Sequence, residues 1–257
     1  MAIDLSKMRA KLDALQNKDS GDNKFWRPSD GEQAIRIVPT EDGDPFREFH
    51  FHYNVGNNRG FLCPKRNFGD DCPVCEFAST LWKEGTANDD NEAKKMAKGL
   101  FARQRFFSPV LVRGEEDQGV RAWGYGKMAY ESLLGLVLNP EYGDITDPET
   151  GTDLVLTYGK PSGASFPQTK LTPRRRSSPL CDEAVGGDER CAELLDSIPD
   201  FDTLFERKTT SEVNAMLDEY LSGDQSAETS SQETTKYNAT TTTTDPVDAA
   251  FDELMGA

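Results

Sequence analysis

Three cysteines and both histidines of this chain fall within residues 50–75. They are His50, His52, Cys63, Cys72 and Cys75, and the last two form a Cys-x-x-Cys step. Zn²⁺ takes thiolate and imidazole ligands tetrahedrally, and a shell of three cysteines and one histidine leaves no position for water or substrate. We therefore expect one structural Zn²⁺ held by the three cysteines and one histidine.

A disulfide or simply buried cysteines are the alternatives. Residues 1–9 mix charges without a continuous apolar stretch, so we expect no secretory signal and a reducing cytosol, where Cys-x-x-Cys indicates metal binding or redox chemistry. Residues 67–71 before the step are typical of a turn, whereas a thioredoxin-like site would follow a buried strand. Cys181 and Cys191 have no further ligand residue nearby and are expected to be reduced thiols.

The choice of histidine depends on a predicted hairpin. Residues 49–55 alternate as a strand, which would place His50 and His52 on one face. A turn at residues 56–59 would then set His52 opposite Cys63. We favour His52 as the ligand, with His50 as the alternate.

The chain is strongly acidic. It has 29 Lys and Arg against 45 Asp and Glu, a net charge of −16. Nucleic-acid-binding proteins usually carry a basic surface, so any such surface here must be a local stripe. The candidate stripes contain Lys94, Lys95, Lys98, Arg103 and Arg105 in one segment, and Lys170, Arg174, Arg175 and Arg176 in another.

Aromatic and basic residues alternate in two predicted strands, residues 100–113 and 118–127. Cations that follow phosphates and aromatic faces that stack bases are the combination that binds single-stranded nucleic acid. Arg103, Arg105 and Phe107 are predicted to share one face, which favours binding over the alternative that the aromatics are core and the arginines border it. The candidate residues are Arg103, Arg105, Phe106, Phe107, Trp123, Tyr125 and Lys127.

Three regions are expected. Residues 1–22 predict an amphipathic helical arm with Leu5, Met8, Leu12 and Leu15 on one face, and residues 23–222 form the core. Residues 223–257 predict a disordered linker, because residues 223–244 are almost devoid of apolar side chains. At its end, an acidic segment with helical apolar spacing suits a peptide that folds on a partner; the alternative is a frayed terminus. Its candidate partner-binding residues are Asp248, Phe251, Asp252, Glu253 and Leu254.

The core pattern predicts an α+β fold. Strands are expected at residues 33–38, 49–55, 100–113, 118–127 and 153–158, and helices at residues 76–83, 91–98, 128–138 and 211–221. The last helix is preceded by Thr209 and Glu212 in capping-box spacing. Strands flanking inserted helices favour a small β-barrel with insertions over a βαβ repeat.

The chain resembles the T-even-type bacteriophage single-stranded DNA-binding proteins over roughly residues 24–160 and again in the acidic tail. The resemblance lies in Phe25-Trp-Arg27, in Gly31-Glu-Gln-Ala-Ile-Arg-Ile-Val-Pro39, in Gly-Asp-Asp-Cys72-Pro-Val-Cys75 and in Tyr125-Gly-Lys127. It implies an oligonucleotide-binding (OB-fold) β-barrel with a zinc-binding subdomain at about residues 50–80, a basic-aromatic cleft for single-stranded DNA, and no enzymatic activity. It also implies that the acidic tail recruits phage proteins of DNA replication, recombination and repair, in the cytoplasm of an infected bacterial host and without a membrane.

One departure from this family concerns self-association. The family carries an N-terminal run of three basic and two hydroxyl residues used for cooperative binding, whereas Lys7, Arg9 and Lys11 are scattered here. A similar run occurs instead at Arg174-Arg175-Arg176-Ser-Ser178. We expect its arginines to contact phosphates or, without DNA, the acidic tail.

Two other classes of protein bind zinc through cysteine and histidine. A zinc-dependent nucleotide deaminase needs His-x-Glu as its general acid and base, and His50-Phe-His52 does not supply it. A zinc-ribbon transcription or RNA-binding regulator remains the alternative, and it would prefer duplex DNA or structured RNA.

Overall fold

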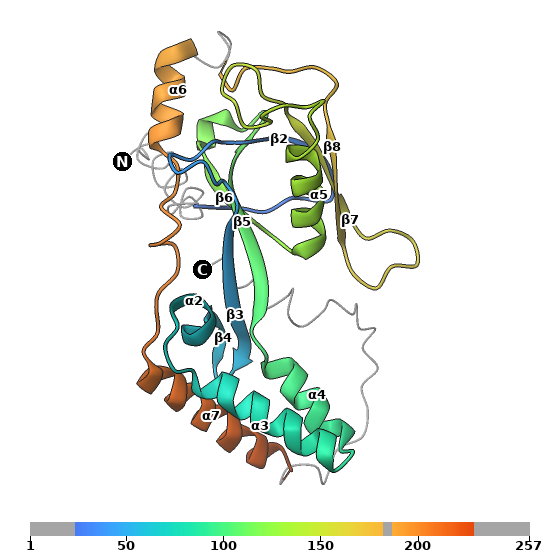
Figure 1. The fold of residues 1–257 in the computed structure, drawn as a ribbon, viewed down its shortest axis with the longest axis vertical. Coiled ribbons are helices and arrows are strands. Elements are labelled where there is room, and N and C mark those ends of the chain that lie inside the picture. Colours follow the sequence, from blue (N-terminus) through green and yellow to red (C-terminus); the bar gives the residue numbers. More distant parts are fainter. Residues whose placement is uncertain (1–23, 182–186, 229–257) are drawn as a thin grey trace, which may run out of the picture.

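The computed structural model describes residues 24–181 and 187–228, and Figure 1 shows an upper sheet joined to a lower group of helices by two long strands. These residues contain eight strands and six α-helices. The elements are β1 (Phe25–Trp26), β2 (Gly31–Ile37), β3 (Arg47–Val55), β4 (Asn58–Leu62), α2 (Pro64–Phe68), α3 (Pro73–Ala87), α4 (Asn91–Leu100), β5 (Arg103–Val112), the 3₁₀ turn η2 (Glu116–Gln118), β6 (Arg121–Tyr125), α5 (Lys127–Val137), β7 (Leu154–Gly159), β8 (Gln168–Pro173), α6 (Gly187–Asp196) and α7 (Thr210–Glu228). The predicted α+β class is confirmed.

The strands form one sheet in the order β1-β6-β5-β2-β7-β8, and β3 joins it through β5. Only β1 against β6 is parallel among these pairings. Within the described residues the hydrogen-bonded path ends at β1 and β8, so the sheet is open. Closure into the expected OB-fold barrel stays a prediction.

β5 connects two lobes of the molecule. Residues 103–107 of β5 pair with β3. Residues 106–110 pair with β6, and residues 110–112 pair with β2. We call the sheet together with α5 the sheet lobe. The helical lobe consists of the hairpin end of β3 and β4 with α2, α3, α4 and α7 (Figure 1).

Each lobe has its own apolar cluster. In the sheet lobe, residues of β2, β5, β6 and β7 pack beneath α5. In the helical lobe, Val213 and Leu217 of α7 pack against Cys63, Cys72 and Val74. The C-terminal helix therefore returns to complete the lobe that holds the cysteine cluster.

Two features fix the path of α7. Thr209 and Glu212 form the predicted capping box, in which the Thr209 N–H donates to Glu212 Oε2 at 2.8 Å and the Glu212 N–H donates to Thr209 Oγ1 at 3.3 Å. Gly56 has φ +62°, and a Cβ there would lie 2.8 Å from the Met216 carbonyl oxygen. The β3–β4 turn and α7 thus approach each other more closely than a residue other than glycine at position 56 would allow.

A buried ionic network ties the sheet to the segment after β8. Arg36 and Asp153 are both buried, and Arg36 Nε donates to Asp153 Oδ1 at 3.0 Å. Arg113 Nη2 donates to the same oxygen at 3.0 Å, and Arg36 Nη2 donates to Ser178 Oγ at 3.0 Å. Burial lowers the pKa of Arg36, and the charge of Asp153 opposes that shift. A Cβ at Gly151 would lie 2.8 Å from Arg36 Nη1, so only glycine leaves room for the guanidinium.

The structure corrects the prediction for Cys181 and Cys191, which form a disulfide rather than reduced thiols. Their Cα atoms lie 5.6 Å apart, within the usual range for a bridge. Leu180 and Leu194 pack in the same apolar cluster, which brings the end of the segment after β8 against α6. The separation of ten residues between the two cysteines did not indicate that the segments carrying them pack together.

Other element predictions were incomplete. The short helix α2 and the strand β8 were not predicted, because α2 has only five residues and β8 has exposed, mostly polar alternate positions. Helix α7 continues to Glu228, past the start of the linker predicted at residue 223. The predicted arm (residues 1–22) and the rest of the linker and tail lie outside the described residues. Within the part that is described, no helix is long and apolar enough to cross a bilayer.

Candidate metal centre and nucleic-acid interface

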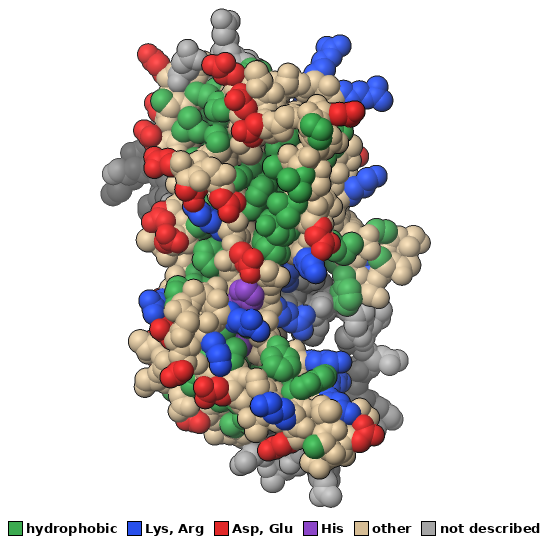
Figure 2. All heavy atoms as spheres, viewed as in Figure 1, with side chains coloured by type: hydrophobic (Ala, Val, Ile, Leu, Met, Phe, Trp, Pro, Cys, Tyr) green, Lys and Arg blue, Asp and Glu red, His purple; other side chains and the backbone are tan. Residues whose placement is uncertain are grey.

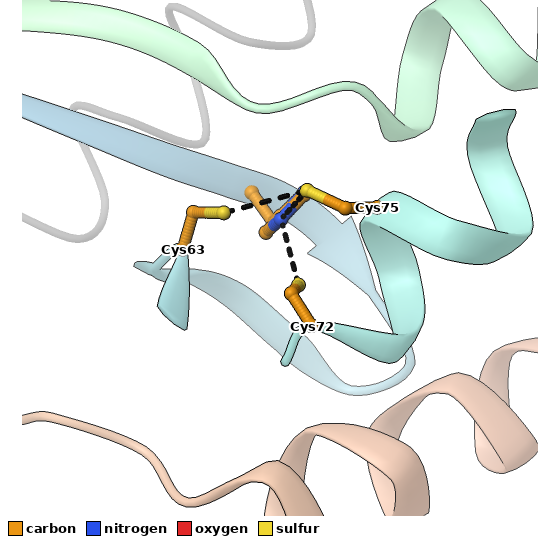
Figure 3. Close-up of side chains that lie close together, drawn as sticks. Cys63, Cys72 and Cys75 are labelled. Carbon is orange, nitrogen blue, oxygen red and sulfur yellow. Dashed lines mark hydrogen bonds between the residues drawn. The ribbon is translucent and has the colours of Figure 1, made fainter. Parts of the chain in front are cut away.

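Four side chains converge in the helical lobe. The ligand atoms of His52, Cys63, Cys72 and Cys75 all lie within 4.8 Å of one another, and Figure 3 shows the three thiols directed toward one point. Cys72 Sγ and Cys75 Sγ lie 3.3 and 3.5 Å from His52 Nε2, and Cys63 Sγ lies 3.4 Å from Cys75 Sγ. This cluster could hold a metal ion.

The local fold explains the convergence. His52 projects from β3, while Cys63 and Cys72 are the N-cap residues of α2 and α3, and Cys75 lies in the first turn of α3. Pro64 and Pro73 follow the two caps, where the missing N–H and fixed φ of proline favour a helix start. The sequence therefore starts a helix at each cysteine cap and turns its thiol inward.

The structure places His52, rather than His50, with the cysteines. His52 is fully buried, and its Nδ1 lies 2.8 Å from the Leu100 carbonyl oxygen, so the Nδ1–H donates there and Nε2 faces the thiols. The His50 side chain is 21% exposed, with Nε2 3.6 Å from Glu48 Oε1.

The predicted register of the hairpin was wrong by about two residues. His52 pairs with Phe61, and the Cys63 N–H donates to the His50 carbonyl at 2.8 Å, because Val55 pairs with Asn58 around a tighter turn than residues 56–59. Cys63 reaches His52 only because the chain leaves β4 and bends into α2. The ligand prediction therefore rested on a hairpin that was only approximately placed.

The donor set fits a tetrahedral cation. Ligands at about 2.3 Å from Zn²⁺ for sulfur and about 2.0 Å for nitrogen would lie about 3.5–3.8 Å from one another. The thiols also shift one another's pKa. Hydrogen bonds from Cys72 and Cys75 lower the pKa of Cys63 to about 3, and the hydrogen bond with Cys63 raises the pKa of Cys75. A bound cation would favour the thiolate form of all three.

A second candidate site lies in the sheet lobe. A cavity of about 460 Å³ opens where β6 meets α5 and where β7 meets β8. Its lining combines aromatic rings, cations and backbone: Trp26, Arg27, Pro28, Arg105, Trp123, Gly124, Tyr125, Gly126, Lys127, Met128, Ala129, Tyr158, Pro167, Gln168 and Thr169. The structure thus brings together the predicted residues Arg105, Trp123, Tyr125 and Lys127.

The cavity has two supporting features. Arg105 reaches toward α5, since a Cβ at Gly126 would lie 3.4 Å from Arg105 Nη1. Gly126 is also the N-cap of α5, and no side chain caps that helix start. Its first N–H groups and the nearby cations both suit an anion.

Phe106 and Phe107 were expected in the cleft, and this was wrong. Phe106 is 2% exposed and stacks on Tyr130 with centroids 3.8 Å apart, while Phe107 is fully buried against Phe51 and Phe205. From residue 106 onward both faces of β5 are covered, so alternation no longer separates core from surface. Trp123 and Tyr125 are also mostly buried, although they line the cavity.

The remaining predicted contacts lie apart from the cavity. Arg103 is half-buried at the start of β5. Arg174, Arg175 and Arg176 are exposed after β8, and Arg174 Nη1 lies 3.8 Å from Asp153 Oδ2. Thr169, at the other end of β8, lines the cavity, so Arg174 is about 16 Å away along the strand. The predicted partner-binding residues Asp248, Phe251, Asp252, Glu253 and Leu254 lie outside the described residues.

Sequence reasoning missed Trp26, Arg27 and Tyr158 as lining residues. They come from β1, its following residue and β7, far from the basic-aromatic strands in sequence. The Phe-Trp-Arg motif at residues 25–27 was the only signal that could have indicated two of them.

Comparison with known proteins supports a nucleic-acid function. A family model described as "gp32 DNA binding protein like" matches residues 29–220, which include both lobes and the cysteine cluster. No curated protein matches the chain.

Proposed function

Because this chain belongs to the gp32-like family of DNA-binding proteins, we propose that it binds single-stranded DNA without sequence preference through the cavity of the sheet lobe. The observation that carries the proposal is the lining of that cavity. Arg27, Arg105 and Lys127 lie there together with the partly exposed Tyr158 and the buried Trp26.

The charge of the lining supports this assignment. The chain carries 45 acidic residues, yet none of the described residues that line the cavity is Asp or Glu. Phosphates would therefore meet cations in the lining itself, although Lys127 Nζ also lies 3.6 Å from Glu131 Oε1 just outside it, and bases would stack on the partly exposed Tyr158 ring. A duplex keeps its bases paired and stacked inside, so this combination favours single strands.

The metal centre has a structural part in this proposal. The metal is Zn²⁺, since three thiolates and one imidazole are its preferred closed shell and leave no position for substrate. The ion would be held by His52, Cys63, Cys72 and Cys75. It would thereby fix the starts of α2 and α3 to β3. The ion supplies folding energy, and the DNA contacts come from protein side chains.

The wider role follows from the family resemblance and is part of the proposal. The protein protects single strands during phage DNA replication, recombination and repair in the infected bacterial cytoplasm. Residues 245–257 recruit replication and recombination proteins, and copies associate along the strand. The sheet completes an OB-fold barrel.

Replacing a cation of the cavity tests the proposed contact directly. We expect Arg105→Gln to weaken binding of oligo-dT about 10- to 150-fold, because a hydrogen bond to a charged group contributes about 1.5–3 kcal/mol. The slope of log affinity against log salt should fall by about 0.7 for the lost phosphate contact. Fluorescence titration at two salt concentrations measures both quantities.

Arg190→Gln is the matched control, since Arg190 lies on α6 and pairs with Glu193 at 2.8 Å. It removes the same charge and should leave affinity and slope unchanged. Equal losses in the two variants would mean that only net charge matters, which would contradict a cavity contact.

The acidic tail should compete with DNA for the basic surface. Residues 223–257 contain Asp224, Glu228, Glu233, Asp245, Asp248, Asp252 and Glu253 against Lys236 alone. Because α7 runs to Glu228, the deletion should remove residues 229–257. We expect it to raise affinity for oligo-dT at least about fivefold, the lower end of typical coupling between sites, and to steepen the salt dependence. Unchanged binding isotherms would end this idea.

A further inference from the structure

Cysteines in two chemical states occur in the described residues. Cys63, Cys72 and Cys75 are free thiols in the helical lobe, whereas Cys181 and Cys191 form a disulfide. Figure 1 shows α6, which carries Cys191, at the end of the molecule away from α3 and α4. A metal centre needs its cysteines as thiolates, so conditions that keep it loaded contain thiols rather than strong oxidants. The bridge therefore has to meet thiols as well.

The bridge is accessible to a small thiol. Cys181 and Cys191 are both partly exposed. They are ten residues apart, and a bridge that closes a short loop restrains the unfolded chain less than one that closes a long loop. Exposed disulfides exchange with thiols more readily than the structural bridges that resist reduction. Both features favour exchange over a permanent cross-link.

The chain before Cys181 is held by bonds that do not involve the bridge. The Leu180 N–H donates to the Pro148 carbonyl at 2.7 Å, and the Leu180 carbonyl accepts from Arg113 Nη1 at 2.7 Å. The Pro179 carbonyl accepts from Arg113 Nη2 at 2.8 Å. Arg113 also belongs to the buried ionic network of the sheet lobe. Cys181 should therefore keep its position when the bridge opens, which makes closure of the bridge repeatable.

Helix α6, on the other side of the bridge, has a small buried face. Among those of its residues whose burial the structure describes, only Leu194 is buried. Arg190 Nη2 donates to the Glu116 carbonyl at 3.3 Å. Glu189 is exposed, and in Figure 2 Asp and Glu side chains gather over the end of the molecule where α6 lies. The bridge thus adds a covalent tie to a helix that few apolar contacts hold.

The chain returns from α6 to the helical lobe through residues 197–209. Phe201 is buried in this segment, and the Phe205 ring packs edge-to-face on Phe51 of β3 with centroids 4.9 Å apart. These rings anchor the segment between α6 and α7 independently of the bridge. Opening the bridge should therefore loosen α6 and leave α7 and the cysteine cluster in place.

We propose that Cys181 and Cys191 form a reversible thiol–disulfide site, which ties α6 to the sheet lobe when oxidised and exchanges with small thiols such as glutathione. A glutathione thiolate attacks one sulfur of the bridge, and the other cysteine leaves as a thiolate that takes a proton. A second glutathione thiolate attacks the mixed disulfide and releases the first cysteine, which is protonated in turn. The bridge gains two electrons and two protons, and two glutathione molecules are oxidised to glutathione disulfide. This site does not depend on the proposed DNA binding.

Equilibration of the metal-loaded full chain in mixtures of reduced and oxidised glutathione tests the site. Trapping with iodoacetamide and peptide mass mapping give the fraction of Cys181 and Cys191 in the bridge, and hydrogen exchange follows α6. We expect the bridge to open and close reversibly without denaturant. Amides of α6 should exchange about 30-fold faster in the reduced state, the lower end of the usual stabilisation by a disulfide. Exchange in α3 and the metal content should stay the same.

The double variant Cys181→Ser/Cys191→Ser is the matched control, and its α6 amides should exchange at the faster rate in every mixture. The titration of the natural protein decides the matter if this variant fails to fold. A bridge that glutathione opens only after denaturation would overturn the proposal, as would two cysteines that stay reduced in excess oxidised glutathione. Equal exchange of α6 in the oxidised and reduced states would contradict the tie to the sheet lobe.

Discussion

Chelation of the metal should unfold the helical lobe while much of the sheet lobe keeps its protection from hydrogen exchange. Structural Zn²⁺ sites contribute on the order of 10 kcal/mol to folding at neutral pH. The four ligands come from β3, the α2 cap and the start of α3, and Cys63 and Cys72 belong to the same apolar cluster as Val213 of α7. We therefore expect amides of α3 and α7 to lose protection together, and added Zn²⁺ to restore it.

The two histidines provide a matched pair of variants for this prediction. His52→Ala should reproduce the effect of chelation, since His52 is buried with its Nδ1 on the Leu100 carbonyl. His50→Ala should retain one metal per chain and nearly full stability. Loss of the metal in the His50 variant, or retention in the His52 variant, would contradict the ligand assignment. Hydrogen-exchange protection of α7 that does not change when the metal is removed would contradict the predicted unfolding of the helical lobe.

The second large effect should come from Asp153. Asp153→Asn leaves Arg36 buried without its counter-charge, and breaking a buried pair in this way typically costs about 3–5 kcal/mol. The expected loss is larger than for most surface changes because Arg113 also donates to Asp153. Denaturant unfolding measures this loss of unfolding free energy, and the slope of that free energy against denaturant concentration should stay unchanged.

Glu193→Gln is the control for Asp153→Asn. Glu193 pairs with Arg190 on the surface of α6, where an ion pair contributes about 0–1 kcal/mol. A loss in the Asp153 variant no greater than in this control would show that the network contributes little to stability. Metal content should stay at its natural value in both, which separates this effect from that of the helical lobe.

The metal cluster could be predicted because its chemistry is local. Cys63, Cys72 and Cys75 fall close together in sequence, and the restricted ligand preference of Zn²⁺ leaves few alternatives. The alternation around His52 was sufficient to rank the histidines even though the hairpin register was wrong. What the sequence could not reveal is the packing of α7 on this cluster, since it joins segments about 150 residues apart.

The cavity could be predicted only in part. Arg105 and Lys127 were found because basic residues stand out beside aromatic ones in a strand. Phe106 and Phe107 show the limit of that reasoning, because a strand covered on both faces buries every side chain whatever its alternation. Tyr158 was missed since only the sheet order β5-β2-β7 brings its strand near. The disulfide was missed for the same reason, because tertiary packing brings its two cysteines together.

The proposed preference of the protein for single strands is tested by competition for a labelled oligo-dT. Unlabelled poly-dT, duplex DNA and structured RNA are each titrated against the complex of the full chain with labelled oligo-dT, at two salt concentrations, with the metal content known. If the protein prefers single strands, poly-dT should displace the label at the lowest concentration and duplex DNA should displace little. Displacement by duplex DNA or structured RNA at concentrations equal to or lower than poly-dT would contradict it, and would favour a regulator of the zinc-ribbon type.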